Sequence, residues 1–191
     1  MWRVLERLQS EHRNLFRLAN LLEERARRVL RPQRSDLELM VDTMYYLTNF
    51  PDVYLHPTED RIVEHLRNLN GISVGFANDL TFQHSTLAEQ GLDLLRDLES
   101  VAREETLSWV NVAPNLRLYA ERLRHNMVVE ELALFPAAAC KLGVDERFAI
   151  ETTHTAAKED PLFGASVEDR FRELHRVIAA EAGCGCDNSP S

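Results

Sequence analysis

The chain has 191 residues, of which 45% are hydrophobic and 28% are charged, which suits a globular domain with a sizeable core. A net charge of −9 disfavours nucleic acid as the main partner. No apolar run approaches the roughly 18 residues that a membrane span needs, and the amino terminus lacks the apolar core of a signal peptide. We therefore expect a soluble, cytoplasmic protein without a membrane partner. Its three cysteines are too few for a disulfide framework, although Cys184 and Cys186 in the tail could bind a soft metal or form a redox pair.

Apolar residues recur with helical period along most of the chain. The first predicted helix ends at Arg31-Pro-Gln-Arg34, and Ser35 is the expected N-cap of the second. Pro51 and Pro57 should interrupt or kink the second helix, since each proline removes a backbone donor, and Pro114 should kink the fourth. The four long helices are expected over about residues 2–30, 36–69, 73–103 and 106–140.

Short connections between these helices imply an all-α, antiparallel up-down-up-down four-helix bundle. Two shorter helices follow, near residues 145–157 and 166–182. We therefore divide the chain into a bundle, residues 1–140, and a helical C-terminal cap with a frayed tail, residues 141–191.

Four histidines lie at matching depth in the four long helices. Counted outward from each connection at about 1.5 Å per residue, they fall within roughly one or two helical turns of a common level. Such a cluster of buried imidazoles would be costly to desolvate, and the rings would repel one another on protonation. A shared cation removes both difficulties, so the pattern predicts metal ligands at His12, His56, His84 and His125.

Carboxylates should complete the site, and the second helix offers two. Asp60 follows His56 by four residues, about 40° around an ideal helix, so both side chains can reach one site. Glu59 follows His56 by three residues on its other side and is the alternative.

The fourth helix is less regular. Glu130 follows His125 by five residues, roughly 140° away in an ideal α-helix, unless the helix widens locally to a π-type turn. Glu131 points the opposite way round, and Glu121, one turn before His125, is easier to reach. Helical geometry alone does not decide which of these three carboxylates belongs to the site.

Four motifs carry a family resemblance: His12, His56-Pro-Thr-Glu-Asp60, Gln83-His84, and His125 followed by Glu130-Glu131-Leu-Ala-Leu-Phe-Pro136. They resemble the hemerythrin family, in its bacterial HHE cation-binding branch, over roughly residues 5–140. The resemblance implies a non-haem di-iron centre, bridged by two carboxylates and an oxo or hydroxo group. It implies terminal ligands at His12, His56, His84 and His125, and it favours Asp60 and Glu130 as the bridging carboxylates, with Glu59 and Glu131 as further ligands to consider.

Two positions depart from the pattern of oxygen-carrying hemerythrins. Those proteins have a further histidine four residues from the one on the third helix, where this chain has Leu80 and Ala88. Asp60 also stands where glutamate is more usual. Both differences weigh against stable, reversible oxygen carriage.

The sequence leaves three hypotheses for the function. The leading hypothesis is a di-iron protein that binds or senses oxygen, nitric oxide or peroxide, or responds to iron. The second is an enzyme that reduces peroxide or nitric oxide or repairs iron centres. The third is a bundle that binds zinc, manganese or no metal and serves protein contacts. The pattern leaves the oligomeric state open.

Overall fold

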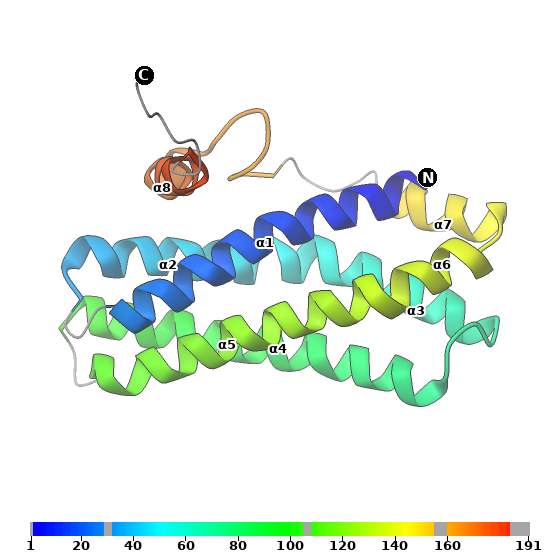
Figure 1. Ribbon diagram of the computed structural model, residues 1–191, viewed down its shortest axis with the longest axis horizontal. Coiled ribbons are helices and arrows are strands. Elements are labelled where there is room, and N and C mark those ends of the chain that lie inside the picture. Colours follow the sequence, from blue (N-terminus) through cyan, green and yellow to red (C-terminus); the bar gives the residue numbers. More distant parts are fainter. Residues whose placement is uncertain (1, 29–31, 105–107, 155–159, 184–191) are drawn as a thin grey trace, which may run out of the picture.

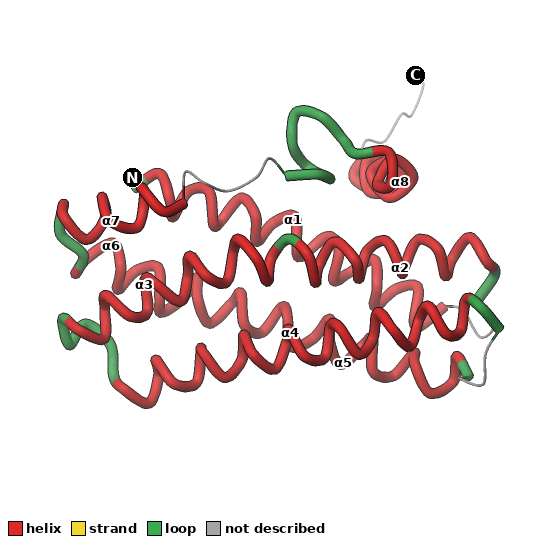
Figure 2. Tube along the Cα trace, turned by 180° about the vertical axis from the view of Figure 1, so that it is seen from behind, coloured by secondary structure: helices red, strands yellow, loops and turns green. Residues whose placement is uncertain are grey.

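The computed structural model describes residues 2–28, 32–104, 108–154 and 160–183, and all regular structure in these ranges is helical (Figure 2). The long helices pack as an antiparallel bundle, and shorter helices follow at the C-terminal end (Figure 1). The predicted all-α, up-down-up-down four-helix bundle is confirmed.

Four helical segments run along the bundle, and two of them are composite. The second and fourth each contain a short π-helical section, written η, between two α-helices. In chain order the segments are α1 (Arg3–Arg28); α2 (Arg34–Asn49), η1 (Pro51–Leu55) and α3 (His56–Asn68); α4 (Val74–Ala102); and α5 (Trp109–Val129), η2 (Glu130–Leu134) and α6 (Phe135–Lys141).

Each π-helical section is followed by an α-helix whose second residue is a proline. These prolines are Pro57 in α3 and Pro136 in α6. A proline has no N–H to donate, and its ring clashes with the carbonyl four residues earlier. A wider turn relieves this clash and displaces the following residues around the helix axis. The prolines therefore influence which side chains face the bundle interior.

The ends of the helices follow local capping chemistry. Ser73 caps α4 by accepting a hydrogen bond from the Phe76 backbone N–H (3.1 Å), as expected for a helix that begins after Asn70-Gly71. The expected cap at Ser35 is wrong, because α2 already begins at Arg34. Gln33 occupies the N-cap position, and its backbone N–H donates to Asp36 Oδ2 (3.3 Å).

The core lies along the bundle axis, and stripes of apolar residues at helical spacing supply much of it. Buried residues of α1 recur at helical spacing, as do those of α4, and each stripe is interrupted by one buried histidine. The stripes comprise Leu5, Leu8, His12, Leu15, Ala19, Leu22 and Ala26 on α1, and Ala77, Leu80, His84, Leu87, Gly91, Leu94 and Leu98 on α4.

The C-terminal helices pack against the outside of the bundle. Helix α7 (Val144–His154) lies beside the start of α1, where Trp2 Nε1 donates a hydrogen bond to Glu151 Oε1 (2.8 Å; Figure 1). Further along, the Tyr46 hydroxyl of α2 donates to Asp160 Oδ2 (3.0 Å). A short 3-10 turn, η3 (Asp169–Phe171), then leads into α8 (Arg172–Gly183), which crosses the bundle and is seen nearly end-on in Figure 1.

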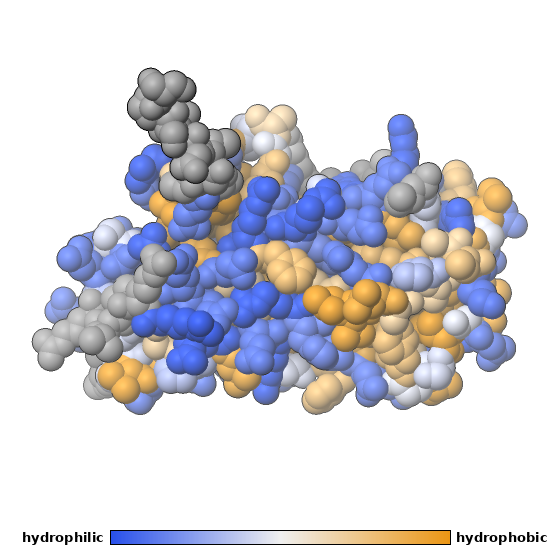
Figure 3. Space-filling view, in the orientation of Figure 1, coloured by the Kyte–Doolittle hydropathy of each residue, from blue (hydrophilic) through white to orange (hydrophobic). Residues whose placement is uncertain are grey.

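The visible surface is mostly hydrophilic, with apolar groups gathered toward the end of the bundle where α6 and α7 lie (Figure 3). Among the described residues, no helix is long and apolar enough to cross a membrane.

Candidate metal centre

Three histidines and two glutamates meet in the middle of the core. His12 comes from α1, His56 is the first residue of α3, and His84 lies in α4. Glu59 lies one turn after His56, and Glu130 is the first residue of η2. Both glutamates are 0% exposed, and all three histidines are buried.

The five side chains form two overlapping donor groups. One contains His56, Glu59 and His84, the other contains His12, Glu59 and Glu130, and the donor atoms within each group lie within 4.8 Å of one another. Glu59 belongs to both groups. Its Oε1 lies 3.0 Å from His12 Nε2, and its Oε2 lies 3.7 Å from His84 Nε2.

Glu130 also reaches both sides of the cluster. Its Oε1 lies 2.8 Å from His84 Nε2, and its Oε2 lies 3.5 Å from His12 Nε2. Two carboxylates that each span the same pair of imidazoles are arranged as bridges between two positions. Aromatic contacts hold the rings in place, because His56 stacks on His84 at 4.4 Å between centroids and His12 stacks on Phe135 at 5.2 Å.

These donors fit a pair of metal ions. Glu59 Oε2 and Glu130 Oε2 are buried and have no hydrogen-bond partner among the described residues, which is costly for carboxylate oxygens. Ions bound at about 2.0–2.2 Å would satisfy both oxygens and would place neighbouring donors about 3 Å apart. The observed separations of 2.8–3.7 Å match that spacing. Imidazole with carboxylate suits iron, zinc or manganese.

Without a metal the cluster behaves as a network of buried ion pairs. Burial acts to lower the pKa of His12, but the hydrogen bond and charge of Glu59, aided by Glu130 and Glu131, raise it to about 9. Burial opposes ionisation of His84 as well, yet hydrogen bonds to Asp60 and Glu130 raise its pKa to about 10.

The two glutamates respond in opposite directions. Burial acts to raise the pKa of Glu59, but hydrogen bonding to His12 and the charges of the three histidines lower it overall. Burial and the charge of Glu59 raise the pKa of Glu130, only partly offset by His84. A divalent ion would compete with the protons on the imidazoles, so metal binding should release protons.

A matched set of polar groups surrounds the donors. Asp60 Oδ1 lies 2.8 Å from His84 Nδ1, and Glu131 Oε1 lies 3.1 Å from His12 Nδ1. The Asn126 amide, 1% exposed, donates to Glu130 Oε1 (3.2 Å). Asp60 and Glu131 thus contact the outer nitrogens of two rings, and Asn126 donates to a carboxylate inside the cluster.

Residues 3–138 match the family described as the hemerythrin HHE cation binding domain. The chain belongs to this family. No curated protein and no solved structure gives a significant match to it. The match spans nearly the whole bundle, and the buried histidine and glutamate groups of this hemerythrin HHE domain suggest a metal site.

Most of the residues predicted for the hemerythrin site do meet. His12, His56, His84 and Glu130 lie in the cluster, and the carboxylate that joins them from α3 is Glu59, the alternative to Asp60. The carboxylate of Asp60 instead lies on the outer nitrogen of His84, with its side chain 42% exposed. The inward face of α3 therefore carries His56 and Glu59, three residues apart, and Asp60 lies beside it.

The structure does not bring His125 to the cluster. The inward face of α5 runs through Leu123, Asn126 and Met127 to Glu130, and His125 lies outside it, exposed. The widened turn that would have placed His125 and Glu130 on one face does not lie between them, because the π-helical section begins at Glu130 itself.

Asn126 was not predicted from the sequence as a residue of the site. It precedes Glu130 by four residues, the ordinary α-helical spacing, which could have identified it. His125 instead lines a surface cavity of about 220 Å³ together with Gln83 and Arg122. Gln83 connects this cavity to the interior, since its Oε1 accepts a hydrogen bond from Asn126 (3.4 Å).

The remaining candidates lie away from the donors. Glu121 and His175 are exposed, and His65 is half-buried. Leu80, where the further histidine of oxygen carriers could have stood, is fully buried, so α4 contributes one imidazole here. Cys140 is a free, exposed thiol, whereas Cys184 and Cys186 lie outside the described residues.

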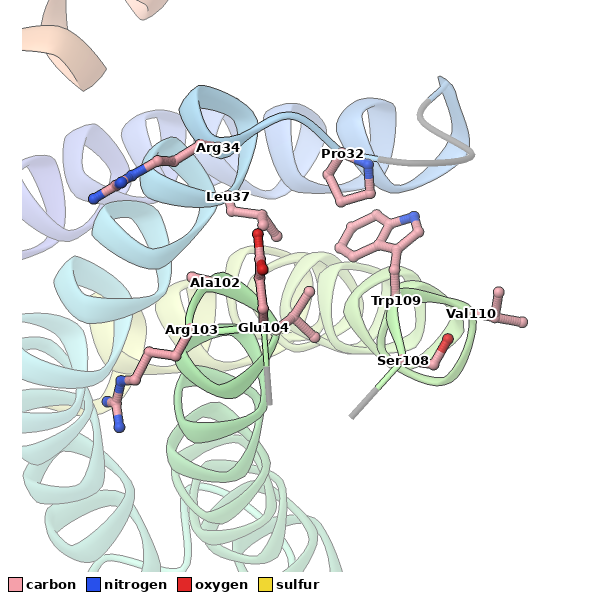
Figure 4. A pocket seen from close by; sticks show the side chains of 10 residues that line it. Pro32, Arg34, Leu37, Ala102, Arg103, Glu104, Ser108, Trp109 and Val110 are labelled. Atoms are coloured by element: carbon pink, nitrogen blue, oxygen red, sulfur yellow. The ribbon is translucent and has the colours of Figure 1, made fainter. Parts of the chain in front are cut away.

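A cavity of about 600 Å³ lies at one end of the bundle, between the start of α2, the end of α4 and the start of α5 (Figure 4). Leu37 and Trp109 face each other across it, beside Pro32. It shares no residue with either donor group. The assignment of the site therefore depends on the donors and their spacing.

Proposed function

We propose that this hemerythrin-like protein holds two iron ions in the bundle core and uses them to bind or sense oxygen or nitric oxide, or to respond to iron. The observation that carries the proposal is the shared carboxylate, because Glu59 belongs to both buried donor groups. His56 and His84 would hold one ion and His12 the other, with Glu59 and Glu130 between them. Iron bound there would supply reversible one-electron chemistry toward a small diatomic molecule.

The protein itself contributes positioning and exclusion of water. Five donors that are 0–5% exposed lie among apolar side chains such as Leu80 and Phe135, so a small uncharged molecule is favoured over a large or charged one. The helices fix the donors before any ion binds, which limits rearrangement on binding.

A second candidate function is reduction of peroxide or nitric oxide, or repair of iron centres. It is favoured by Leu80 and Ala88 of α4, which supply no nitrogen where oxygen carriers have a further histidine. Fewer protein ligands leave more room for an exogenous one. A site for zinc or manganese is the third possibility, since the same donors suit those ions.

The deciding experiment is metal analysis of protein produced with ample iron and purified without oxygen. We expect about two irons per chain, and near-ultraviolet absorption from an oxidised di-iron pair once the purified sample is exposed to air. Spectral titration with oxygen, nitric oxide and peroxide then tests binding, and sustained turnover with a reductant would favour the enzyme. Metal-free, colourless protein under these conditions would refute both iron functions, and stoichiometric zinc or manganese would favour the third.

A further inference from the structure

Two consecutive acidic residues occur on each composite helical segment. In the second segment, Glu59 enters both donor groups while Asp60 turns outward to the neighbouring helix α4. There Asp60 Oδ1 lies 2.8 Å from His84 Nδ1, and the opposite nitrogen of the same ring, Nε2, lies 2.8 Å from Glu130 Oε1.

The fourth segment repeats the arrangement. Glu130 enters the cluster while Glu131 turns to helix α1, where its Oε1 lies 3.1 Å from His12 Nδ1. The other nitrogen of that ring, Nε2, lies 3.0 Å from Glu59 Oε1. In both pairs the first carboxylate therefore faces the donor site, and the second contacts the outer nitrogen of a histidine on another helix.

This repetition has a chemical consequence. An imidazole that binds a metal through Nε2 keeps its proton on Nδ1, and an acceptor on Nδ1 fixes both the tautomer and the rotation of the ring. A carboxylate in that position also makes Nε2 a stronger donor. His12 and His84 each have such an acceptor, in short contact and from a different helix.

We propose that Asp60 and Glu131 are positioning residues of the metal centre, which accept hydrogen bonds from Nδ1 of His84 and His12 and direct Nε2 of each ring toward the ions. The inference rests on the proposed function, and it assigns Asp60 a role in place of direct ligation.

Ordinary surface electrostatics does not account for the two contacts. Exposed ion pairs contribute little and usually join residues one turn apart on one helix. Asp60 and Glu131 join separate helical segments, and each meets a ring that is no more than 5% exposed. A half-exposed carboxylate on a buried imidazole leaves one oxygen for solvent while the other orients the ring.

The test compares removal of the acceptor with removal of the charge alone. Asp60→Ala and Glu131→Ala remove both, whereas Asp60→Asn and Glu131→Gln keep an oxygen that can still accept from Nδ1–H. Glu64→Ala and Glu121→Ala are matched controls, because both residues are exposed on the same helical segments. Thermal unfolding of the metal-free proteins checks that each variant folds.

Ferrous iron is titrated anaerobically into each protein, and the reduction potential of the loaded centre is measured. We expect the alanine variants to bind iron about 10–100-fold more weakly than the controls, with the amide variants in between. The potential should rise in all four, because a less basic imidazole stabilises the ferric state less. In the zinc-loaded protein, ¹⁵N spectra should show a proton on Nδ1 of both His12 and His84 that exchanges slowly with solvent. In each alanine variant, the Nδ1 proton of the ring that loses its acceptor should exchange rapidly.

Affinities and potentials equal to those of Glu64→Ala and Glu121→Ala would overturn the positioning role while leaving the metal site intact. Wild-type protein that binds neither iron nor zinc would overturn the proposed function and this inference together. Should an alanine variant fail to fold, the amide variants decide, since an unchanged potential in both of them contradicts the role.

Discussion

Replacing the shared carboxylate should remove both ions, whereas replacing a histidine should remove one. Glu59→Gln keeps the size and hydrogen-bonding capacity of the side chain but removes its charge. Because Glu59 is the only residue common to the two donor groups among the described residues, its loss affects both. His56→Gln and His12→Gln each change one group, so each variant should retain about one ion per chain.

The stability effect follows from linkage between binding and folding. An ion present at about 100 times its dissociation constant stabilises the folded state by about 2.7 kcal/mol, so two ions contribute about 5 kcal/mol. For a chain of this size that corresponds to about 10–20 °C in Tm. Glu59→Gln should lose nearly all of this metal-dependent increase, and each histidine variant about half.

Metal analysis and thermal unfolding with and without ferrous iron measure both quantities on the same samples. Glu64→Gln is the matched control, since Glu64 is exposed on the same helix and should keep two ions and the full increase in Tm. The reasoning fails if Glu59→Gln loses a single ion, as His56→Gln does, or if it keeps two.

Three further results are expected. His125→Ala should leave the metal content unchanged and shift stability by less than about 0.5 kcal/mol, because the ring is exposed; loss of an ion would return His125 to the site. Gly91→Ala should cost about 1–3 kcal/mol in urea unfolding, since an added Cβ would lie 2.9 Å from Thr48 Cγ2; an unchanged midpoint would contradict this. In the metal-free protein, the pKa values of His12 and His84 are raised to about 9 and about 10, above the usual 6.5 of an unfolded chain. Their stabilising effect is complete below about pH 6.5 and is lost as the pH rises through these values, so Tm should fall between pH 7 and pH 10, and a flat profile would exclude this coupling.

Periodicity and helix length predicted much of the architecture. The apolar stripes of α1 and α4, each broken by one histidine, are long and regular, so their inward faces could be predicted from the chain alone. The depth of His12, His56 and His84 also followed from counting residues along antiparallel helices. Such counting works because rise per residue is nearly constant over many turns.

The choice between neighbouring acids could not be made in this way. Rotation about a helix axis changes by about 100° per residue, so a single extra residue in a widened turn moves a different side chain to the interior. Prolines signalled that the second segment was irregular, but they did not show that η1 would end before His56 and bring Glu59 inward in place of Asp60.

In the fourth segment, too, the sequence did not show which residues face the interior. Assuming that His125 faced inward required a widened turn before Glu130, whereas an ordinary α-helix that starts from Asn126 reaches Glu130 with no distortion. The inward face of this segment could therefore be predicted from Glu130 but not from His125. Where two acids are adjacent, as with Glu130 and Glu131, a histidine on another helix can take one of them as the hydrogen-bond partner of its outer nitrogen. In the proposed centre, one acid of each pair would bind the ion and the other would accept a hydrogen bond from the ring, and the variants of Asp60 and Glu131 test this division.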